Sequence, residues 1–304
     1  MNFDIAIIGG GPAGNSAAIY AARKGLKTGL LAETFGGQVI ETVGIENMIG
    51  TLYTEGPKLM AQVEEHTKSY DVDIIKSQLA TGIEKKELIE VTLANGAVLK
   101  SKTAILALGA KWRNINVPGE EEFRNKGVTY CPHCDGPLFE GKNVAVIGGG
   151  NSGLEAALDL AGITKHVTVL EFLPELKADQ VLQERAAKTD NLTILKNVAT
   201  KEIVGQDHVT GLNYVERDTN EEKHLDLEGV FVQIGLVPST AWLKDSGIEL
   251  NERQEIIVDK FGSTNIPGIF AAGDCTDSAY KQIIISMGSG ATAAIGAFDY
   301  LIRQ

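Results

Sequence analysis

Two cysteines with two residues between them lie near the middle of the chain, and an acidic residue follows directly: Cys131-Pro132-His133-Cys134-Asp135. Thiols at this spacing can close into a disulfide and reopen. A helix N-terminus or a protonated His133 would lower the pKa of the attacking thiol, and Asp135 could then move the proton. The pattern therefore suits reversible thiol–disulfide chemistry, with zinc binding as the competing interpretation.

The zinc interpretation needs more ligands at short spacing, because structural zinc sites usually have four. The third cysteine, Cys275, lies 141 residues beyond Cys134. The histidines other than His133 are scattered along the chain: His66, His166, His208 and His224. We therefore expect a redox pair and no metal. Cys275 is most simply a small buried residue, and the sequence leaves open whether His133 tunes the thiols or is merely exposed.

The chain carries two glycine-rich nucleotide fingerprints, each in the required context of strand, glycine loop, helix, strand and acidic residue. In the first, these elements are residues 3–8, Gly9–Gly14, 15–24, 28–32 and Glu33. In the second, they are residues 143–147, Gly148–Gly153, 154–161, 166–170 and Glu171. Because the two fingerprints match element for element, we expect the chain to bind two dinucleotides.

The positions within each fingerprint have separate roles. The first glycine (Gly9, Gly148) makes the turn, the second (Gly11, Gly150) lets a pyrophosphate approach the backbone, and the third (Gly14, Gly153) lets the helix pack on the strand. The helix N-terminus faces the phosphates, and the acid accepts a hydrogen bond from a ribose 2′-hydroxyl.

The remaining patterns complete an α/β fold of two Rossmann-like, three-layer domains, the second inserted into the first. A strand at 269–272 ends at Gly273-Asp274, where open α/β sheets place ligand contacts, and a closing helix is expected at 288–301. Antiparallel strands are expected over 74–99, with a hairpin turn at Asn95-Gly96, before a strand at 103–108. Linkers are predicted at 117–120 and 238–245. The first domain then comprises residues 1–114 and 245–304, and the second residues 115–244.

Composition limits the classes of function. With 304 residues, 43% hydrophobic and 22% charged, the chain is typical of a globular protein of about two domains. Its formal net charge of −12 argues against binding nucleic acid or an anionic membrane surface. The N-terminus lacks a basic signal-peptide region, and the most apolar stretch, 283–298, is rich in Gly, Ala and Ser. We therefore expect a cytoplasmic protein.

Taken together, these residues resemble the low-molecular-weight thioredoxin reductase family over essentially the whole chain. The matching motifs are Gly9–Gly14 (GGGPAG), Gly36-Gly37-Gln38, Glu46-Asn47, Ala107-Leu108-Gly109, and Gly273-Asp274 followed by Lys281-Gln282. Within the family, residues 109–113, 127–137 and 231–235 most resemble the flavoprotein component of alkyl hydroperoxide reductase.

The resemblance implies that NAD(P)H passes a hydride to FAD, which reduces a Cys131–Cys134 disulfide, and that the dithiol reduces a thioredoxin- or glutaredoxin-like partner. It implies that Cys131 attacks the partner, that Cys134 lies nearer the flavin and that Asp135 is the acid/base. It also implies a homodimer.

The cofactor-binding residues expected from the fingerprints and the resemblance fall into two groups. The FAD group is Gly9, Gly11, Pro12, Ala13, Gly14, Glu33, Gly37, Gln38, Asn47, Gly109, Gly273, Asp274, Lys281, Gln282 and Ile283. The nicotinamide-nucleotide group is Gly148, Gly150, Asn151, Ser152, Gly153, Glu171 and Gly235.

The segment after the second fingerprint predicts NADH rather than NADPH. A 2′-phosphate needs cationic partners here, but residues 170–175 contain none and the first arginine is Arg185. Glu171 would accept from a free 2′-hydroxyl and repel a phosphate. Lys177 is the one residue that argues against this prediction.

One departure from the peroxide-reductase flavoproteins is the absence of their N-terminal thioredoxin-like region. We expect a natural short form, rather than a fragment, that uses a separate redoxin. The alternatives are the catalytic part of an alkyl hydroperoxide reductase system, a disulfide reductase fed by another flavin or a ferredoxin, and a degenerate flavoprotein used for binding or sensing. Because the redox pair belongs to the inserted domain, we also expect a domain rotation about linkers near Pro118 and Pro238.

Overall fold

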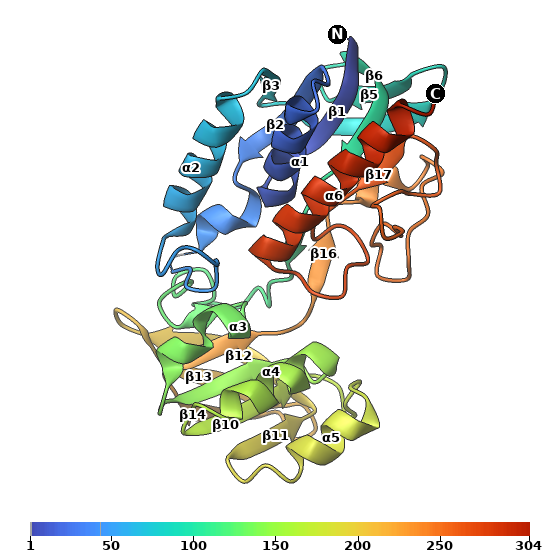
Figure 1. Cartoon of the computed structure of the whole chain (residues 1–304). Coiled ribbons are helices and arrows are strands. Elements are labelled where there is room, and N and C mark those ends of the chain that lie inside the picture. Colours follow the sequence, from blue (N-terminus) through green and yellow to red (C-terminus); the bar gives the residue numbers. More distant parts are fainter. Residues whose placement is uncertain (1, 43) are drawn as a thin grey trace. The chain divides into compact units, whose positions relative to one another are not determined.

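The computed structural model describes residues 2–42 and 44–304. The chain forms two compact units (Figure 1): unit 1 contains the chain up to Lys111 together with Val237–Gln304, and unit 2 is Trp112–Leu236. The expected α/β architecture, with one Rossmann-like domain inserted into another, is confirmed.

The two segments that connect the units differ in position from the expected linkers. The breaks follow Lys111 and Leu236, instead of residues 114 and 244. Val117–Glu120 lies inside unit 2, because the Pro118 carbonyl accepts a hydrogen bond from Ile203 N at 2.9 Å. The passages themselves, β7 (Ala110–Trp112) and β16 (Leu236–Pro238), pair as a two-stranded sheet.

Unit 1 is built on one large sheet. Its strands are β1 (Asn2–Gly10), β2 (Thr28–Phe35), β3 (Val72–Lys76), β4 (Ala80–Lys85), β5 (Ile89–Leu93), β6 (Val98–Leu106) and β17 (Ile269–Ala271). The helices are α1 (Pro12–Arg23), α2 (Gly56–Lys68), α6 (Ile283–Leu301) and the 3-10 turns η1 (Gly37–Glu41) and η3 (Ala241–Leu243). The order is β3-β2-β1-β6-β5-β4, with β17 also on β6.

Strand β6 has two kinds of partner. It pairs antiparallel with β5 near its start and parallel with β1 and β17 further along. The end of the expected antiparallel region, at Val98 and Leu99, and the start of the strand expected at 103–108 therefore belong to one continuous strand, which ends at Leu106. Ile74 belongs to β3, which pairs parallel with β2 rather than joining the antiparallel strands. The expected hairpin turn at Asn95-Gly96 is present, with Gly96 at φ +82°.

Alternation along these strands separates two cores. Ile5, Ile7, Leu30, Ile105 and Phe270 face the alanines of α1 and α6, whereas their neighbours in the strands face β4, β5 and residues 243–256. This period of two gives unit 1 its three layers. By length and composition α6 could cross a membrane, but a Cβ at Gly290 would lie 2.1 Å from the Ala13 carbonyl oxygen, so its small residues are needed for packing on α1.

Unit 2 repeats this architecture. Its parallel sheet has the order β11 (Leu192–Lys196), β10 (His166–Glu171), β9 (Asn143–Ile147), β15 (Gly229–Val232) and β8 (Val128–Thr129). Helices α4 (Asn151–Ala161) and α5 (Gln180–Ala186) pack on one face. The antiparallel strands β12 (Val198–Gly205), β13 (Val209–Glu216) and β14 (Glu221–Asp226) belong to the second core, on the other face. The short helix α3 (Pro132–Asp135) and the turn η2 (Gly136–Phe139) connect β8 to β9.

Candidate functional site

The first glycine loop has the geometry expected of a nucleotide cradle. Gly9 has φ +121°, and a Cβ there would lie 2.0 Å from the Ala107 carbonyl oxygen. A Cβ at Gly14 would lie 1.8 Å from the Gly9 carbonyl oxygen, whereas a Cβ at Gly11 would meet nothing within 4 Å. Pro12 and Ala13 begin α1 directly behind the loop. Two glycines are thus required by packing, and the middle one leaves space for a ligand.

Asn15 anchors this loop, although no sequence motif marked it. Its side chain is fully buried and donates to the carbonyls of Gly10 at 2.8 Å and Gly11 at 3.0 Å. Its own carbonyl oxygen accepts from Thr67 Oγ1 on α2 at 2.8 Å. A polar residue on the inward face of an Ala-rich helix was the available signal, because a buried amide must have partners.

Other segments of unit 1 meet at the same edge of its sheet. A Cβ at Gly37 would lie 3.5 Å from Gly11 Cα, and Gln38 follows on η1. Asn47 Nδ2 donates to Gln282 Oε1 at 3.2 Å, and Ile283 packs against the cluster that contains Val39 and Ile45. The structure therefore brings together predicted FAD residues that are more than 230 positions apart.

The strand ends supply the rest of the predicted FAD group. Glu33 is exposed near the end of β2, and Gly109, with φ +68° and open space at its Cβ position, follows β6. After β17, a Cβ at Gly273 would lie 2.9 Å from Ala13 Cβ. The next residue, Asp274, accepts a hydrogen bond from Ser286 Oγ at 2.8 Å. Burial raises the pKa of the Asp274 carboxyl, although the Ser286 hydrogen bond opposes the shift.

Lys281 is held by a partner that no sequence motif predicted. Its ammonium lies 2.9 Å from Glu255 Oε1, with both side chains about 15% exposed or less, and it donates to the Thr276 carbonyl at 2.5 Å. Glu255 also accepts from Asn251 Nδ2 at 2.7 Å. The positive charge of Lys281 is therefore paired within unit 1.

The second glycine loop, in unit 2, repeats the first. Gly148 has φ +116°, and a Cβ there would lie 2.5 Å from the Gln233 carbonyl oxygen. A Cβ at Gly153 would lie 1.9 Å from the Gly148 carbonyl oxygen, and a Cβ at Gly150 would meet nothing within 4 Å. Asn151 and Ser152 begin α4, and Gly235 is exposed at φ +100°. The same three-glycine logic thus holds in both units.

Glu171 closes this second loop from the end of β10. It is 8% exposed, and its carboxylate accepts from Gly149 N at 2.5 Å and from Leu173 N at 2.7 Å. The acid is therefore fixed against the glycine loop by two backbone amides.

Two basic residues have contacts next to Glu171 or its loop. Lys177, whose side chain is exposed, donates its backbone N–H to the Gly149 carbonyl at 3.1 Å. Arg217, the residue after β13, lies 3.9 Å from the Phe172 ring centroid and donates to the Phe172 carbonyl at 2.8 Å. Arg217 was not predicted, because it lies 46 positions after Glu171.

The cysteine pair follows β8 at the same edge of the unit 2 sheet as the second glycine loop. Cys131 and Cys134 form a disulfide, and α3 begins directly after Cys131. Asp135 accepts a hydrogen bond from Thr129 Oγ1, and burial raises the pKa of its carboxyl. His133 is mostly exposed and lies 3.6 Å from the exposed Asp159. The predicted pair and its acid are therefore adjacent in a strand–turn–helix junction.

The third cysteine and possible metal-binding clusters are further candidates for chemistry. Cys275 is free and fully buried, as expected, and burial raises the pKa of its thiol to about 11. Among residues 2–42 and 44–304, no group of three or more His, Cys, Asp or Glu side chains is arranged to hold a metal ion.

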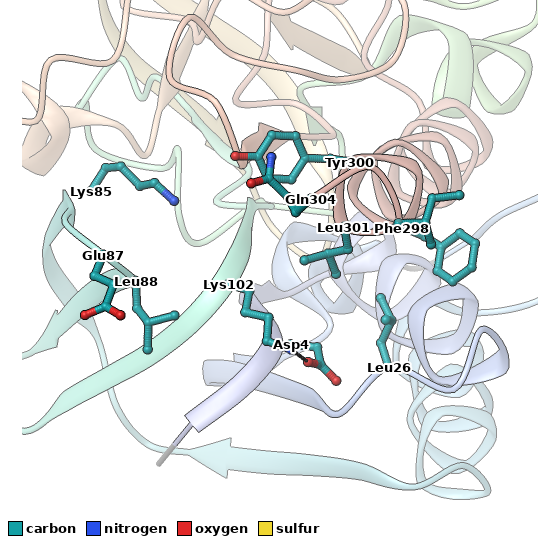
Figure 2. Close-up of a pocket in the computed structure, with 11 residues that line it drawn as sticks. Asp4, Leu26, Lys85, Glu87, Leu88, Lys102, Phe298, Tyr300, Leu301 and Gln304 are labelled. Atoms are coloured by element: carbon teal, nitrogen blue, oxygen red, sulfur yellow. Dashed lines mark ion pairs between the residues drawn. The ribbon is translucent and has the colours of Figure 1, made fainter.

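A cavity of about 420 Å³ lies in unit 1, and no residue of its glycine loop lines it (Figure 2). It is lined by the start of β1, the turn between β4 and β5, and the end of α6, and includes the Asp4–Lys102 ion pair at 2.8 Å. None of the predicted site residues lines it. The cavity therefore does not mark the chemistry that the motifs predict.

Known proteins resemble this chain in sequence and in structure. Two proteins called NADH dehydrogenase, from Bacillus subtilis (strain 168) and Ferdinandcohnia aciditolerans, are 68% identical over 99% of the chain. An alkyl hydroperoxide reductase subunit of Staphylococcus aureus is 60% identical over 99% of it. The chain spans only 58–60% of the length of these relatives.

Solved structures and a family description agree with this resemblance. The crystal structure of thioredoxin reductase from Streptococcus pyogenes is 36% identical with a TM-score of 0.94, covering 100% of this chain and 99% of the other. The family description "Pyridine nucleotide-disulphide oxidoreductase" matches residues 3–290. The chain therefore belongs to the pyridine nucleotide-disulphide oxidoreductase family.

Proposed function

We propose that the chain is an NADH-dependent flavoprotein disulfide reductase of thioredoxin-reductase type, which passes electrons through FAD and the Cys131–Cys134 disulfide to a small redoxin. The observation that carries the proposal is the repeated glycine cradle: Gly11 and Gly150 each leave open space between two glycines that packing requires. A disulfide followed by a half-buried acid at the same sheet edge in unit 2 adds the chemistry.

The residues of unit 1 fit FAD, which the family implies. The open Gly11 position and the N-terminus of α1 suit the pyrophosphate, and Asp274 is a half-buried acceptor at the strand edge where ligands bind. Glu33, Gly37, Gln38, Asn47, Gly109 and the Lys281–Ile283 segment complete the proposed set. When bound, the flavin supplies two-electron transfer between the nicotinamide and the disulfide.

The residues of unit 2 have distinct proposed roles. Gly148–Gly153 and the start of α4 bind the nicotinamide dinucleotide, with Gly235 at the rim. Cys131 attacks the partner's disulfide and Cys134 resolves the mixed disulfide. Asp135 gives the proton to the departing sulfur, because burial keeps its carboxyl protonated at higher pH than an exposed aspartate.

The preference for NADH rests on Glu171. Its fixed carboxylate would accept a hydrogen bond from a free ribose 2′-hydroxyl and repel a 2′-phosphate. Lys177 and Arg217 are the basic residues that argue against this preference. We therefore expect kcat/KM to be higher for NADH than for NADPH, and a clear preference for NADPH would contradict the assignment.

A second candidate function is the catalytic part of an alkyl hydroperoxide reductase system. It is supported by the 60% identity to the Staphylococcus aureus reductase over 99% of this chain. In both candidates a thioredoxin- or glutaredoxin-like domain or protein receives the electrons. A homodimer, a cytoplasmic location and rotation of the inserted unit during turnover complete the proposal.

Anaerobic titration with NADH tests the proposal directly. The flavin absorbance should bleach, and candidate redoxins should then be reduced by the wild-type protein. Cys131→Ser and Cys134→Ser variants should still bleach with NADH but fail to reduce any redoxin. If NADH leaves the flavin oxidised, the electron-donor assignment fails; if the cysteine variants retain redoxin reduction, the disulfide is not the exit point.

An engineered crosslink between the units should block redoxin turnover, and full activity would contradict rotation.

A further inference from the structure

The environment of Asp135 contains a hydroxyl to which none of the family motifs assigns a role. Thr129, the last residue of β8, is 5% exposed. Its Oγ1 donates a hydrogen bond to Asp135 Oδ2 and accepts one from Cys131 N at 3.3 Å. One hydroxyl therefore touches both the acid and the backbone of the first cysteine.

The backbone around this hydroxyl is held on both sides. Thr129 pairs with Phe231 of β15, and Gln233 Nε2 donates to the Tyr130 carbonyl at 2.9 Å. On the α3 side, Asp135 N and Cys134 N both donate to the Cys131 carbonyl, at 3.0 and 3.1 Å. The contact is thus part of a fixed junction between strand and helix.

The charged groups around the junction have other partners. His133 of α3 faces Asp159 of α4, while Glu120 accepts from the Tyr130 phenol and Arg124 lies 4.9 Å from the Tyr130 ring centroid. Among the described residues, burial and the Thr129 hydroxyl are the two causes that shift the pKa of Asp135. The thiols of the reduced motif are adjacent titratable groups.

We propose that Thr129 is a positioning residue for Asp135, which holds the carboxyl beside the redox pair in both of its protonation states. A hydroxyl suits this task because it donates to a carboxylate and accepts from a carboxylic acid. The proposal deepens the proposed function, because it rests on Asp135 being the proton donor.

The reaction that Thr129 would support is a balanced two-step exchange. The Cys131 thiolate forms a bond to one sulfur of the partner's disulfide while that disulfide breaks, and the departing sulfur takes the proton of Asp135. The Cys134 thiol gives its proton to the Asp135 carboxylate and its sulfur bonds to Cys131, which releases the second partner sulfur as a thiolate. The Cys pair is oxidised by two electrons and the partner's disulfide is reduced by two.

The test compares two small disulfides with the full chain, reduced chemically and freed of reductant under anaerobic conditions. Glutathione disulfide releases a thiolate that needs a proton, whereas an aromatic disulfide such as dithionitrobenzoate releases one that is stable without it. Because this exchange needs no NADH, it tests the role of Thr129 even if NADH is not the electron donor. A wrong electron-donor assignment and a wrong role for Thr129 therefore give different results.

Thr129→Val, which keeps the shape and removes the hydroxyl, should slow the reaction with glutathione disulfide about tenfold, a modest share of a typical acid-base contribution. The aromatic disulfide should react within about twofold of wild type, and Thr129→Ser should restore both rates. In an Asp135→Asn background, Thr129→Val should cause no further loss. Equal slowing with both disulfides, or a further loss in the Asp135→Asn background, would overturn the proposal, as would an unaltered rate in Asp135→Asn alone.

A direct measurement covers the case in which the Val variant folds poorly. Asp carboxyl ¹³C NMR of the disulfide form, with the Asp135 signal identified by its loss in Asp135→Asn, reports the titration midpoint. Thr129→Ala and Thr129→Val should both raise it, since the hydrogen bond to the charged carboxylate is stronger than that to the neutral acid and both are lost. An unmoved midpoint would contradict the proposed contact.

Discussion

Replacing Asn15 by alanine tests whether a buried amide holds the first glycine loop. The variant loses two hydrogen bonds to the carbonyls of Gly10 and Gly11 and one from Thr67. Both carbonyls keep another donor, since Gly36 N donates to Gly10 and Asn15 N donates to Gly11. Thr67 Oγ1 also keeps the Val63 carbonyl. These three partners are therefore not left unpaired, so we expect the cost to come mainly from the lost bonds.

At about 1 kcal/mol for each of these hydrogen bonds, the loss of stability is about 3 kcal/mol. For a domain of this size, 1 kcal/mol corresponds to roughly 2–4 °C, so the Tm of unit 1 should fall by roughly 6–12 °C. The assay is calorimetry of the FAD-free full chain, followed by measurement of the FAD dissociation constant, which should rise because the loop loses its anchor.

The matched control is Asn151→Ala in the second loop. Asn151 also exchanges two hydrogen bonds, with Asp179, but at the surface, so its loss should cost about 0.5 kcal/mol or less. A Tm shift for Asn15→Ala that does not exceed that of Asn151→Ala would refute the reasoning.

Three further predictions concern the glycines and the titrating groups. Gly153→Ala should abolish NADH binding in calorimetric titration, because its Cβ would lie 1.9 Å from the Gly148 carbonyl oxygen. The control is Gly162→Ala, which should bind NADH normally because the atom nearest to its Cβ would lie at 3.3 Å. Because burial raises the folded pKa of Asp274, its contribution to stability is lost as pH rises through that pKa. Asp274→Asn should therefore raise the Tm of the FAD-free protein at pH 7, less so at pH 4.5, while weakening FAD binding; an unchanged Tm at pH 7 would contradict the shift. With a pKa of about 11, Cys275 is ionised in on the order of one molecule in a thousand at pH 8. Iodoacetamide should therefore label only Cys131 and Cys134 in the reduced, folded protein, as measured by mass spectrometry. Rapid labelling of Cys275 would contradict its burial.

The local motifs were predictable because each depends on residues close together in sequence. The glycine fingerprints predict the local backbone because glycine is needed at each of these positions: Gly9 and Gly148 have positive φ, and a Cβ at Gly14 or Gly153 would clash with a carbonyl oxygen. The order of strand, loop and helix follows from short apolar runs and Ala-rich segments. The insertion of unit 2 in unit 1 was predictable because the strand at 269–272, which completes the first domain, comes after the second fingerprint in the sequence.

Contacts between distant segments were decided by the tertiary structure alone. Asn15 and Thr67 are 52 positions apart, and Lys281 and Glu255 are 26 positions apart, so no local pattern relates them. The same holds for β6, which pairs antiparallel with a local neighbour and parallel with β1 from the start of the chain.

The redox motif shows where the division lies. The sequence by itself predicted a redox pair, Cys131 and Cys134, with an adjacent acid, Asp135, because spacing and residue type are those of thiol–disulfide chemistry. Only the fold decided that Asp135 is half-buried and bonded to Thr129, because burial depends on what β15 and α4 pack against the turn. The proposed proton transfer therefore depends on packing, whereas the proposed electron chemistry depends on residue types that are adjacent in the sequence.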